Sequence, residues 1–472
     1  MVFSSSVFLL LFLPAVYLIN AFISNVVKAK TIWSNCFLVL ASLFFYAWGE
    51  PVLVLLMIAS VLLNWFCGKR ISECSGIGRK IWLFIAVAGD LSALGYYKYA
   101  DFMIRTVNGL LGRELFVSPQ VALPIGISFF TFQAISYVAD VRRGKTEAAP
   151  HLIDTALYIS FFPQLIAGPI VKYRDIHQQI EKRTVSRERT AEGFRRFIFG
   201  LGKKVLIANV LGLCVDTVYS YNPELIDPRA AWIAAVAYTF QIYYDFSGYS
   251  DMAIGLGRMF GFDYPENFNY PYMSSSISEF WRRWHISLGV WFREYVYIPL
   301  GGNRKGKART FLNLAVVFLL TGLWHGANIS FVLWGLYHGF FIIIERAGLG
   351  RILDKKRIIG MLYCFVVVTF GWVLFRLEDG WSAAMLVSRM VRPWHYLQIA
   401  MIPTDAYLDL KTVAILIASV AGAGVLRGGI PEKWKERWKN SVAEAVFCTA
   451  VLILCIAAIA SDTYNPFIYF QF

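Results

Sequence analysis

The chain has 472 residues, of which 57% are hydrophobic and only 16% are charged. A soluble domain carries about 25% charged residues, so the composition excludes a soluble globular protein. Apolar runs of about 20 residues recur along the chain, and each is long enough to cross a bilayer core of ~30 Å. A transmembrane β-barrel would instead show alternating segments of about 10 residues. We therefore expect an all-α polytopic membrane protein.

The net charge of +14 does not indicate nucleic-acid binding, because the basic residues occur in short loops between apolar runs rather than on a face free of the membrane. This is the positive-inside pattern, which predicts that these loops face the cytoplasm. Seven cysteines are scattered without metal-ligand spacing, so no metal site is expected. The basic loops contain Lys28 and Lys30; Lys69, Arg70, Arg79 and Lys80; Arg142, Arg143 and Lys145; Arg304, Lys305, Lys307 and Arg309; Lys355, Lys356 and Arg357; and residues 427–439.

The N-terminal helices, in residues 1–147, are expected to include membrane spans near 4–24, 32–49, 51–66, 81–97 and 121–139.

A broken segment, 148–170, then begins the central part of the chain. Basic residues flank it on both sides, and Pro163, Gly168 and Pro169 interrupt any helix within it. A re-entrant segment satisfies both facts, and broken backbone at membrane depth must be covered by protein or line a cavity. The segment is therefore a candidate pocket wall.

Two further spans are predicted near 194–219 and 231–257. The second contains Asp245 and Asp251. These carboxylates either line a polar pathway or bond to neighbouring helices, and the sequence leaves both interpretations open.

The segment 274–300 is too polar to cross a bilayer and interleaves tryptophan with arginine, which is typical of an interfacial amphipathic helix. In a continuous helix Trp281 and His285, four residues apart, would share a face with Leu288. Arg282 and Arg283 would point elsewhere, toward lipid headgroups or an anionic cofactor.

His325 lies inside the next apolar stretch, in the sequence TGLWHGAN, and an ionisable side chain at membrane depth indicates a functional site. A glycine-rich break after about 13 apolar residues would leave His325 short of the far surface. The pattern Gly-Leu-aromatic-His-Gly occurs here and again around His338, and its small-x-x-x-small spacing favours close helix packing. Burial keeps imidazole uncharged, so His325 can act as a general base. The alternative is a histidine that bonds a backbone carbonyl.

The remaining histidines carry weaker signals. His338 is expected to pack between helices. His151, His177 and His395 fall in loops or at the ends of spans, where a solvated histidine needs no functional explanation. Further spans near 359–376, 412–426 and 442–460 complete the C-terminal part, 347–472.

Several motifs in order resemble the membrane-bound O-acyltransferase (MBOAT) family, and within it the branch of the bacterial alginate O-acetylation membrane protein. They extend over nearly the whole chain and are LPIGISFFTFQAISYVADVRRG, FFPQLIAGPI, YYDFSGYSDMAIGLGRMFGF, FWRRWHISLGVWFREYVYIPLGGNR, TGLWHGAN and YNPFIYFQF. The resemblance implies one membrane domain over 1–472, with a catalytic core at 148–346 that includes the interfacial segment 274–300. It also implies a ring of about 11–13 tilted helices, with re-entrant and interfacial helices around a central tunnel, in the bacterial cytoplasmic membrane.

The family position of the catalytic histidine matches His325, and a second family position matches His285. The resemblance implies acetyl transfer from a cytoplasmic thioester, acetyl-coenzyme A, which is a substrate and not a permanently bound cofactor. The resemblance therefore predicts that the donor and its phosphates are bound by Arg282, Arg283 and Trp281. The implied partners are an exported polysaccharide, an extracytoplasmic esterase-like acetyltransferase and membrane lipids.

Other functions remain open at this stage. The related branch transfers D-alanyl groups to teichoic acid. A transporter without catalysis would also have broken helices and midplane charges, but it predicts inverted internal repeats, which are not visible. A structural assembly subunit would need neither His325 nor a tunnel.

Overall fold

The computed structural model describes residues 1–26, 31–377, 379–396, 398, 400–425, 437–461, 464–465 and 468. Every regular element among them is helical, which confirms the predicted all-α class. The chain separates into two compact units, each described here by itself: unit 1 is Met1–Phe197 with Tyr249–Glu266, and unit 2 is Ile198–Gly248 with Asn267–Phe472. Some sequence predictions lie outside the described residues, namely those for Lys28, Lys30, 427–436 and most of the motif that ends the chain.

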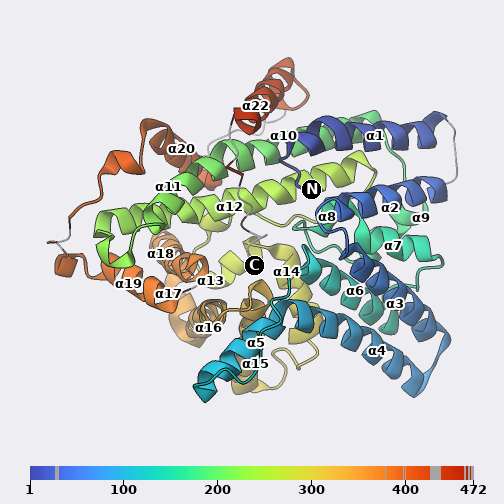
Figure 1. Ribbon diagram of the computed structural model, residues 1–472, viewed down its shortest axis with the longest axis horizontal. Coiled ribbons are helices and arrows are strands. Elements are labelled where there is room, and N and C mark those ends of the chain that lie inside the picture. Colours follow the sequence, from blue (N-terminus) through green and yellow to red (C-terminus); the bar gives the residue numbers. More distant parts are fainter. Residues whose placement is uncertain are drawn as a thin grey trace. The chain divides into compact units, whose positions relative to one another are not determined.

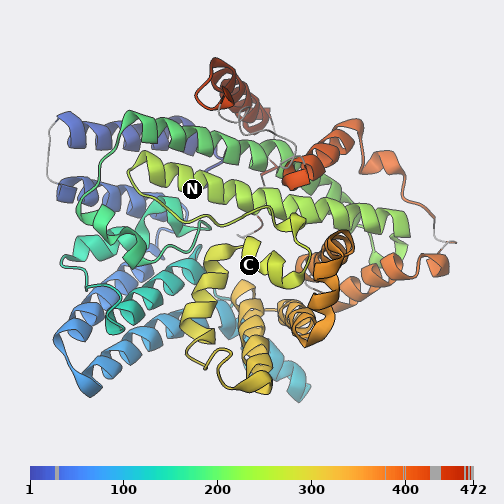
Figure 2. The ribbon, with the colours of Figure 1, turned by 180° about the vertical axis from the view of Figure 1, so that it is seen from behind.

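Unit 1 is built from short and medium helices, of which α3 and α4 form a hairpin (Figures 1 and 2, blue). A polar cluster ties this hairpin together, because buried Asp90 accepts hydrogen bonds from Ser60 at 2.9 Å and from Asn64 at 2.9 Å. The helices are α1 Leu13–Ala21, α2 Thr31–Ala47, α3 Val54–Glu73, α4 Gly76–Leu94, α5 Ala100–Leu111, α6 Ile127–Arg142, α7 Leu152–Ser160, α8 Phe162–Leu165, α9 Tyr173–Glu181 and the first part of α10 Arg187–Gly202.

The segment 148–170 is broken and buried, as predicted. It forms α7 and α8, which are separated by a non-helical Phe161, and residues 157–173 are all buried. With nine residues α7 rises only ~14 Å, which is far less than a bilayer core. Protein groups satisfy the exposed backbone at the break, since the Phe162 N–H donates to the Ser42 hydroxyl at 3.1 Å. Of this segment, only Ala148 at its start lines either of the two cavities described below.

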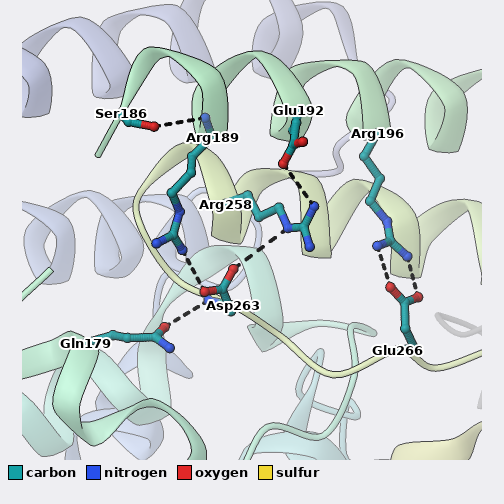
Figure 3. Close-up of polar contacts among 8 residues, drawn as sticks. All are labelled: Gln179, Ser186, Arg189, Glu192, Arg196, Arg258, Asp263 and Glu266. Atoms are coloured by element: carbon teal, nitrogen blue, oxygen red, sulfur yellow. Dashed lines mark hydrogen bonds and ion pairs between the residues drawn. The ribbon is translucent and has the colours of Figure 1, made fainter. Parts of the chain in front are cut away.

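An ion-pair network fixes the connection that follows α12 (Pro228–Met259) against α10 within unit 1 (Figure 3). Arg196 binds Glu266 through both carboxylate oxygens, at 2.6 and 2.5 Å, and Arg189 binds Asp263 at 2.7 Å. Arg258 adds a contact to Asp263 at 3.8 Å. The basic residues predicted to follow the broken segment are therefore partly engaged in intramolecular pairs.

Unit 2 contains the remaining helices. They are the rest of α10, α11 Asn209–Tyr219, most of α12, α13 Ile277–Arg283, α14 Ile286–Phe292, α15 Gly306–His325, α16 Ile329–Ile344, α17 Gly350–Lys355, α18 Arg357–Arg376, α19 Gly380–Val391, α20 Leu410–Val420 and α22 Val442–Ser461.

The α15–α16 hairpin is packed through glycines (Figure 1). Gly322 and Gly335 face each other, and Gly339 lies against Phe318, so the two helices run antiparallel. A side chain at Gly322 would meet the Phe331 carbonyl oxygen at 2.2 Å. The predicted small-x-x-x-small contact is thus confirmed for both Gly-Leu-aromatic-His-Gly motifs.

Six helical segments among the described residues are long and apolar enough to cross a membrane, and three shorter apolar helices accompany them. This confirms a polytopic membrane protein. By length and composition these helices support fewer crossings than the 11–13 expected, because α4, α6 and α12 carry polar residues. The long segments are Val54–Glu73, Arg187–Tyr219, Gly306–His325, Ile329–Leu353, Arg357–Arg376 and Val442–Ser461, and the short ones are Phe8–Ser24, Thr31–Ala47 and Leu410–Gly424.

The two carboxylates of α12 bond to neighbouring helices. Within unit 2, Asp245 forms an ion pair with Lys204, with 2.7 Å between Oδ1 and Nζ, and both side chains are almost fully buried. Within unit 1, Asp251 accepts two N–H groups of Arg196, at 2.9 and 3.1 Å. Buried charges are normally paired in this way. The observed contacts favour structural pairing over a polar pathway.

We predict that Gly322→Ala destabilises the protein by roughly 1–3 kcal/mol, because the added carbon collides with backbone that cannot move aside. Gly109→Ala is the matched control: Gly109 also lies in a helix, but a Cβ there meets nothing within 4 Å. Thermal unfolding of the detergent-solubilised proteins checks this. Equal unfolding midpoints for Gly322→Ala and wild type would contradict the glycine-mediated packing.

Candidate active site

The first helix of the interfacial segment is held at its N-terminus by two polar groups. The Ser276 hydroxyl caps α13 by accepting the Glu279 N–H at 3.0 Å. The buried Glu345 carboxylate accepts the N–H groups of Ile277 and Ser278, at 2.5 and 2.9 Å. A carboxylate at this end also interacts favourably with the helix dipole. Because Glu345 directly follows α16, α13 is anchored to the end of the α15–α16 hairpin.

The interfacial segment is not one helix, so the predicted common face of Trp281, His285 and Leu288 is wrong. The helix ends at Arg283 and resumes at Ile286, with His285 between them in the left-handed region at φ 44° and ψ 52°. The cause is a competing acceptor. The Ile286 N–H donates to the Asn267 carbonyl at 3.0 Å instead of bonding one turn back within the helix. A non-glycine residue in this conformation costs energy and commonly marks a functional site.

Asn267 also determines which nitrogen of His285 carries the proton. Its side-chain oxygen accepts the Ser287 N–H at 3.2 Å and the Ser287 hydroxyl at 2.8 Å, so this atom is an acceptor. His285 Nδ1 lies 3.2 Å from the same oxygen and must therefore be the donor. Burial lowers the pKa of His285 to about 3, so the ring is neutral and Nε2 carries a lone pair.

His325 is the last residue of α15, and it lies close to His285. Its buried ring packs edge-on against Trp334 at 5.0 Å and Phe375 at 5.2 Å between centroids, and its centroid is 6.5 Å from that of His285. The apolar part of α15, from Thr310, rises ~24 Å, which is less than a bilayer core of ~30 Å. Over its full length, Gly306–His325, α15 is long and apolar enough to cross a membrane, so the location of His325 short of the far surface stays a prediction.

A cavity of about 530 Å³ in unit 2 reaches His285, the neighbour of His325. Its wall includes one face of α15, from Leu314 to Thr321, and the other wall is formed by α13 and α14 with Trp281 and His285. His325 itself is not part of the lining; the cavity ends at Thr321, one helical turn before it, and at His285.

Three arginines line the same cavity: Arg282, Arg293 and Arg346, all of them exposed. Since α16 runs antiparallel to α15, Arg346 lies near the start of α15, at the end that carries the basic loops. The cavity is therefore positively charged at this end, largely apolar along its length, and bounded by a neutral histidine at the other end.

Only two of the three predicted donor-binding residues line the cavity. Trp281 and Arg282 line the cavity, whereas Arg283 does not: it is paired with Glu279 at 2.8 Å and donates to the Asn269 carbonyl at 3.2 Å. Sequence reasoning missed Arg293 and Arg346, because an arginine within a helical segment carries no local signal.

His338 is fully buried, and its ring packs edge-on against Trp281 at 5.1 Å and Trp334 at 5.2 Å between centroids, which agrees with the expected packing role. Among the described residues, no group of three or more histidine, cysteine or acidic side chains is placed to hold a metal ion.

A polytopic membrane protein with a buried histidine pair at the end of a cavity has the features of an enzyme site. Comparison with known proteins agrees: the model of the family "MBOAT, membrane-bound O-acyltransferase family" matches residues 115–354. "Probable alginate O-acetylase AlgI" of Pseudomonas putida is 40% identical over the full length of both chains. The peptidoglycan O-acetyltransferase of Helicobacter pylori is 36% identical over 83% of this chain and 80% of its own.

The teichoic acid D-alanyltransferase of Bacillus subtilis is more distant, with 29% identity over 44% of this chain and 55% of its own. The chain belongs to the membrane-bound O-acyltransferase family. It is an O-acyltransferase with several membrane-spanning helices, located in the cell membrane.

We predict that Asn267→Ala lowers acyl transfer at least tenfold and destabilises the fold by about 1–3 kcal/mol, because the His285 ring and the groups of Ser287 lose a buried acceptor. Ser287→Ala is the matched control, since it removes one hydroxyl bond and leaves the contact between His285 and Asn267 intact. Both variants are assayed for transfer and thermal unfolding. If Ser287→Ala reduced activity as much as Asn267→Ala, the positioning role of Asn267 would be refuted.

Proposed function

We propose that this enzyme takes an acetyl group from cytoplasmic acetyl-coenzyme A and transfers it to a hydroxyl presented from outside, for O-acetylation of an exported cell-surface polysaccharide. The observation that carries the proposal is the cavity with arginines at one end and a neutral histidine at the other. The names of these two relatives support acetyl as the group and a polysaccharide as the final acceptor.

The cavity suits a donor with an anionic head and a thin, weakly polar arm. The phosphates of coenzyme A would meet Arg293 and Arg346 near the basic loops, which the positive-inside pattern assigns to the cytoplasm. The pantetheine arm would follow the apolar face of α15. The thioester would then lie beside Thr321 and His285, where the cavity ends.

The chemistry required at this point is a single acyl transfer. A base removes the hydroxyl proton as the hydroxyl oxygen attacks the thioester carbon, and the carbon–sulfur bond of the tetrahedral intermediate then breaks. The base returns its proton to the departing sulfur, so an ester and a free thiol result. General bases of this kind contribute about 10²–10⁴-fold to the rate. A covalent enzyme intermediate is not needed.

The two histidines have different roles in this scheme. His325 lies at the end of α15 opposite the basic loops, where an outside hydroxyl would arrive first, and it serves as the general base. His285 lines the donor cavity and forms the part of its wall beside the thioester, which it helps to position, because the single hydroxyl proton goes to His325.

The final acceptor is expected to be reached through a partner. A polymer outside the membrane cannot enter a site buried between helices, whereas a single hydroxyl on a protein surface loop can. We therefore propose an extracytoplasmic, esterase-like acetyltransferase as the immediate recipient. D-alanyl transfer is the weaker alternative because the D-alanyltransferase relatives align over about half of this chain.

We predict that His325→Ala reduces polysaccharide O-acetylation by at least 100-fold while expression and unfolding temperature stay near wild type. The O-acetyl content of surface polysaccharide is measured by mass spectrometry in cells carrying each variant. His338→Ala is the matched control, because His338 is equally buried but packs against Trp281 and Trp334 rather than beside His285. Wild-type acetylation in His325→Ala, with loss in His285→Ala, would reverse the two assignments. Unchanged acetylation in both histidine variants would refute catalysis at this site.

A second prediction tests the donor cavity. The double variant Arg293→Gln/Arg346→Gln should raise KM for acetyl-coenzyme A about tenfold or more with kcat little changed, since each lost phosphate contact weakens charge-assisted binding. Arg309→Gln is the control, because Arg309 is exposed in the first turn of α15 but does not line the cavity. An unaltered KM in the double variant would show that the donor binds elsewhere.

A further inference from the structure

A second cavity, of about 650 Å³, lies in unit 1, and the transfer reaction does not use it. Two regions form most of it: the adjoining ends of α3 and α4, with Ser72 and Arg79, and the end of α6 with the connection that follows it, from Val141 to Ala148. These are two of the loops whose basic residues predict a cytoplasmic location. The fold of unit 1 therefore brings two positively charged loops, far apart in sequence, around one polar hollow.

Arg79 links these two regions through hydrogen bonds to backbone carbonyls, and other N–H groups of its guanidinium remain for a ligand. Its Nε donates to the Ile71 carbonyl at 3.1 Å, at the end of α3, and its Nη2 donates to the Val141 carbonyl at 3.4 Å, at the end of α6. No ion pair links Arg79 to a carboxylate in the part of the chain that the structure describes. A guanidinium has five N–H groups, so Arg79 can bind an anion in the cavity while it holds the loops together.

The rest of the lining is also suited to an anion. Lys145 adds a second positive charge, and Gly144, with φ 66°, turns the backbone tightly at the rim. The Thr146 hydroxyl is buried, and it has no hydrogen-bond partner among the described residues, so a donor is available for a bound oxygen. Glu147 is the one acidic residue of the lining.

Aromatic residues indicate that this end of unit 1 lies at the membrane surface. The Lys69 ammonium is 5.9 Å from the ring centre of Trp65, and the Arg70 guanidinium is 5.6 Å from that of Trp82. Tryptophan with basic residues at the end of an apolar helix is typical of the headgroup level. The cavity opens at the depth where phosphate groups of anionic lipids are found.

We propose that this cavity binds a phosphate group at the cytoplasmic membrane surface, either the headgroup of an anionic phospholipid or a soluble phosphate. The two positive charges and the unsatisfied hydroxyl supply the recognition. Such a site would bind these parts of unit 1 to anionic groups at the membrane surface. This property is separate from acetyl transfer.

The test uses the full chain in detergent, titrated with phosphatidylglycerol, with phosphatidylcholine and with inorganic phosphate, and binding is followed by native mass spectrometry and by the shift in unfolding temperature. One charge near a membrane surface contributes about 1 kcal/mol, which corresponds to about fivefold in affinity. Lys145→Gln should therefore weaken binding about fivefold, and Glu147→Gln should strengthen it by a similar factor. Lys80→Gln is the matched control, because Lys80 is exposed in α4 next to Arg79 but does not line the cavity.

Preferential binding of phosphatidylglycerol alone identifies the lipid headgroup as the source of the phosphate. Competition by inorganic phosphate identifies a soluble source as well. The proposal is overturned if neither phosphatidylglycerol nor phosphate binds, or if Lys145→Gln and Glu147→Gln change affinity no more than Lys80→Gln. Arg79 is unsuitable as the first variant, because its replacement also removes two bonds that hold the loops.

Discussion

The carboxamide oxygen of Asn267 is the contact on which the candidate active site depends. It receives hydrogen bonds from Ser287 and from the His285 ring, while the carbonyl of the same residue takes the Ile286 N–H. These bonds break what would otherwise be one amphipathic helix. They place His285 in a left-handed conformation that a continuous helix could not provide, and they hold its proton on Nδ1. The position of His285 in the cavity wall and the location of its proton on Nδ1 both depend on this single residue.

The second constraint is the distance between α15 and α16. Glycines at the crossing let the two backbones approach, so the hairpin is rigid and antiparallel. Rigidity fixes His325 at one end of α15, and antiparallel packing brings Arg346 to the other. The same geometry therefore separates the charged part of the donor cavity from the histidine pair. Glu345 extends this effect to α13, because its carboxylate joins the end of the hairpin to the helix that precedes His285.

The large positive charge of the chain is used in more than one way. Arg189, Arg196 and Arg258 are engaged in ion pairs that fix the connection after α12. Arg293 and Arg346 instead face a cavity, as does Arg79 in unit 1. A basic residue beside a hollow lined by apolar or small side chains is available to an anionic ligand. Net charge alone does not distinguish these roles, because only the folded chain shows which residues meet a carboxylate.

Composition and periodicity by themselves determined the helical membrane class and the broken segment 148–170, and they marked His325 as an ionisable residue inside an apolar run, because burial in a bilayer demands long apolar runs and makes each polar exception conspicuous. The candidate role of His285 came from the family resemblance, and the roles of both histidines stay predictions. Tertiary structure decided the rest. The break at His285 arises from Asn267, 18 residues away, and no local helix propensity reveals an acceptor supplied from a distance. Arg283 is committed to Glu279, whereas Arg282 lines the cavity, and two adjacent arginines cannot be told apart before their neighbours are known. Long-range packing determines these outcomes because hydrogen bonds and ion pairs depend on which groups meet in space, and local sequence does not specify that.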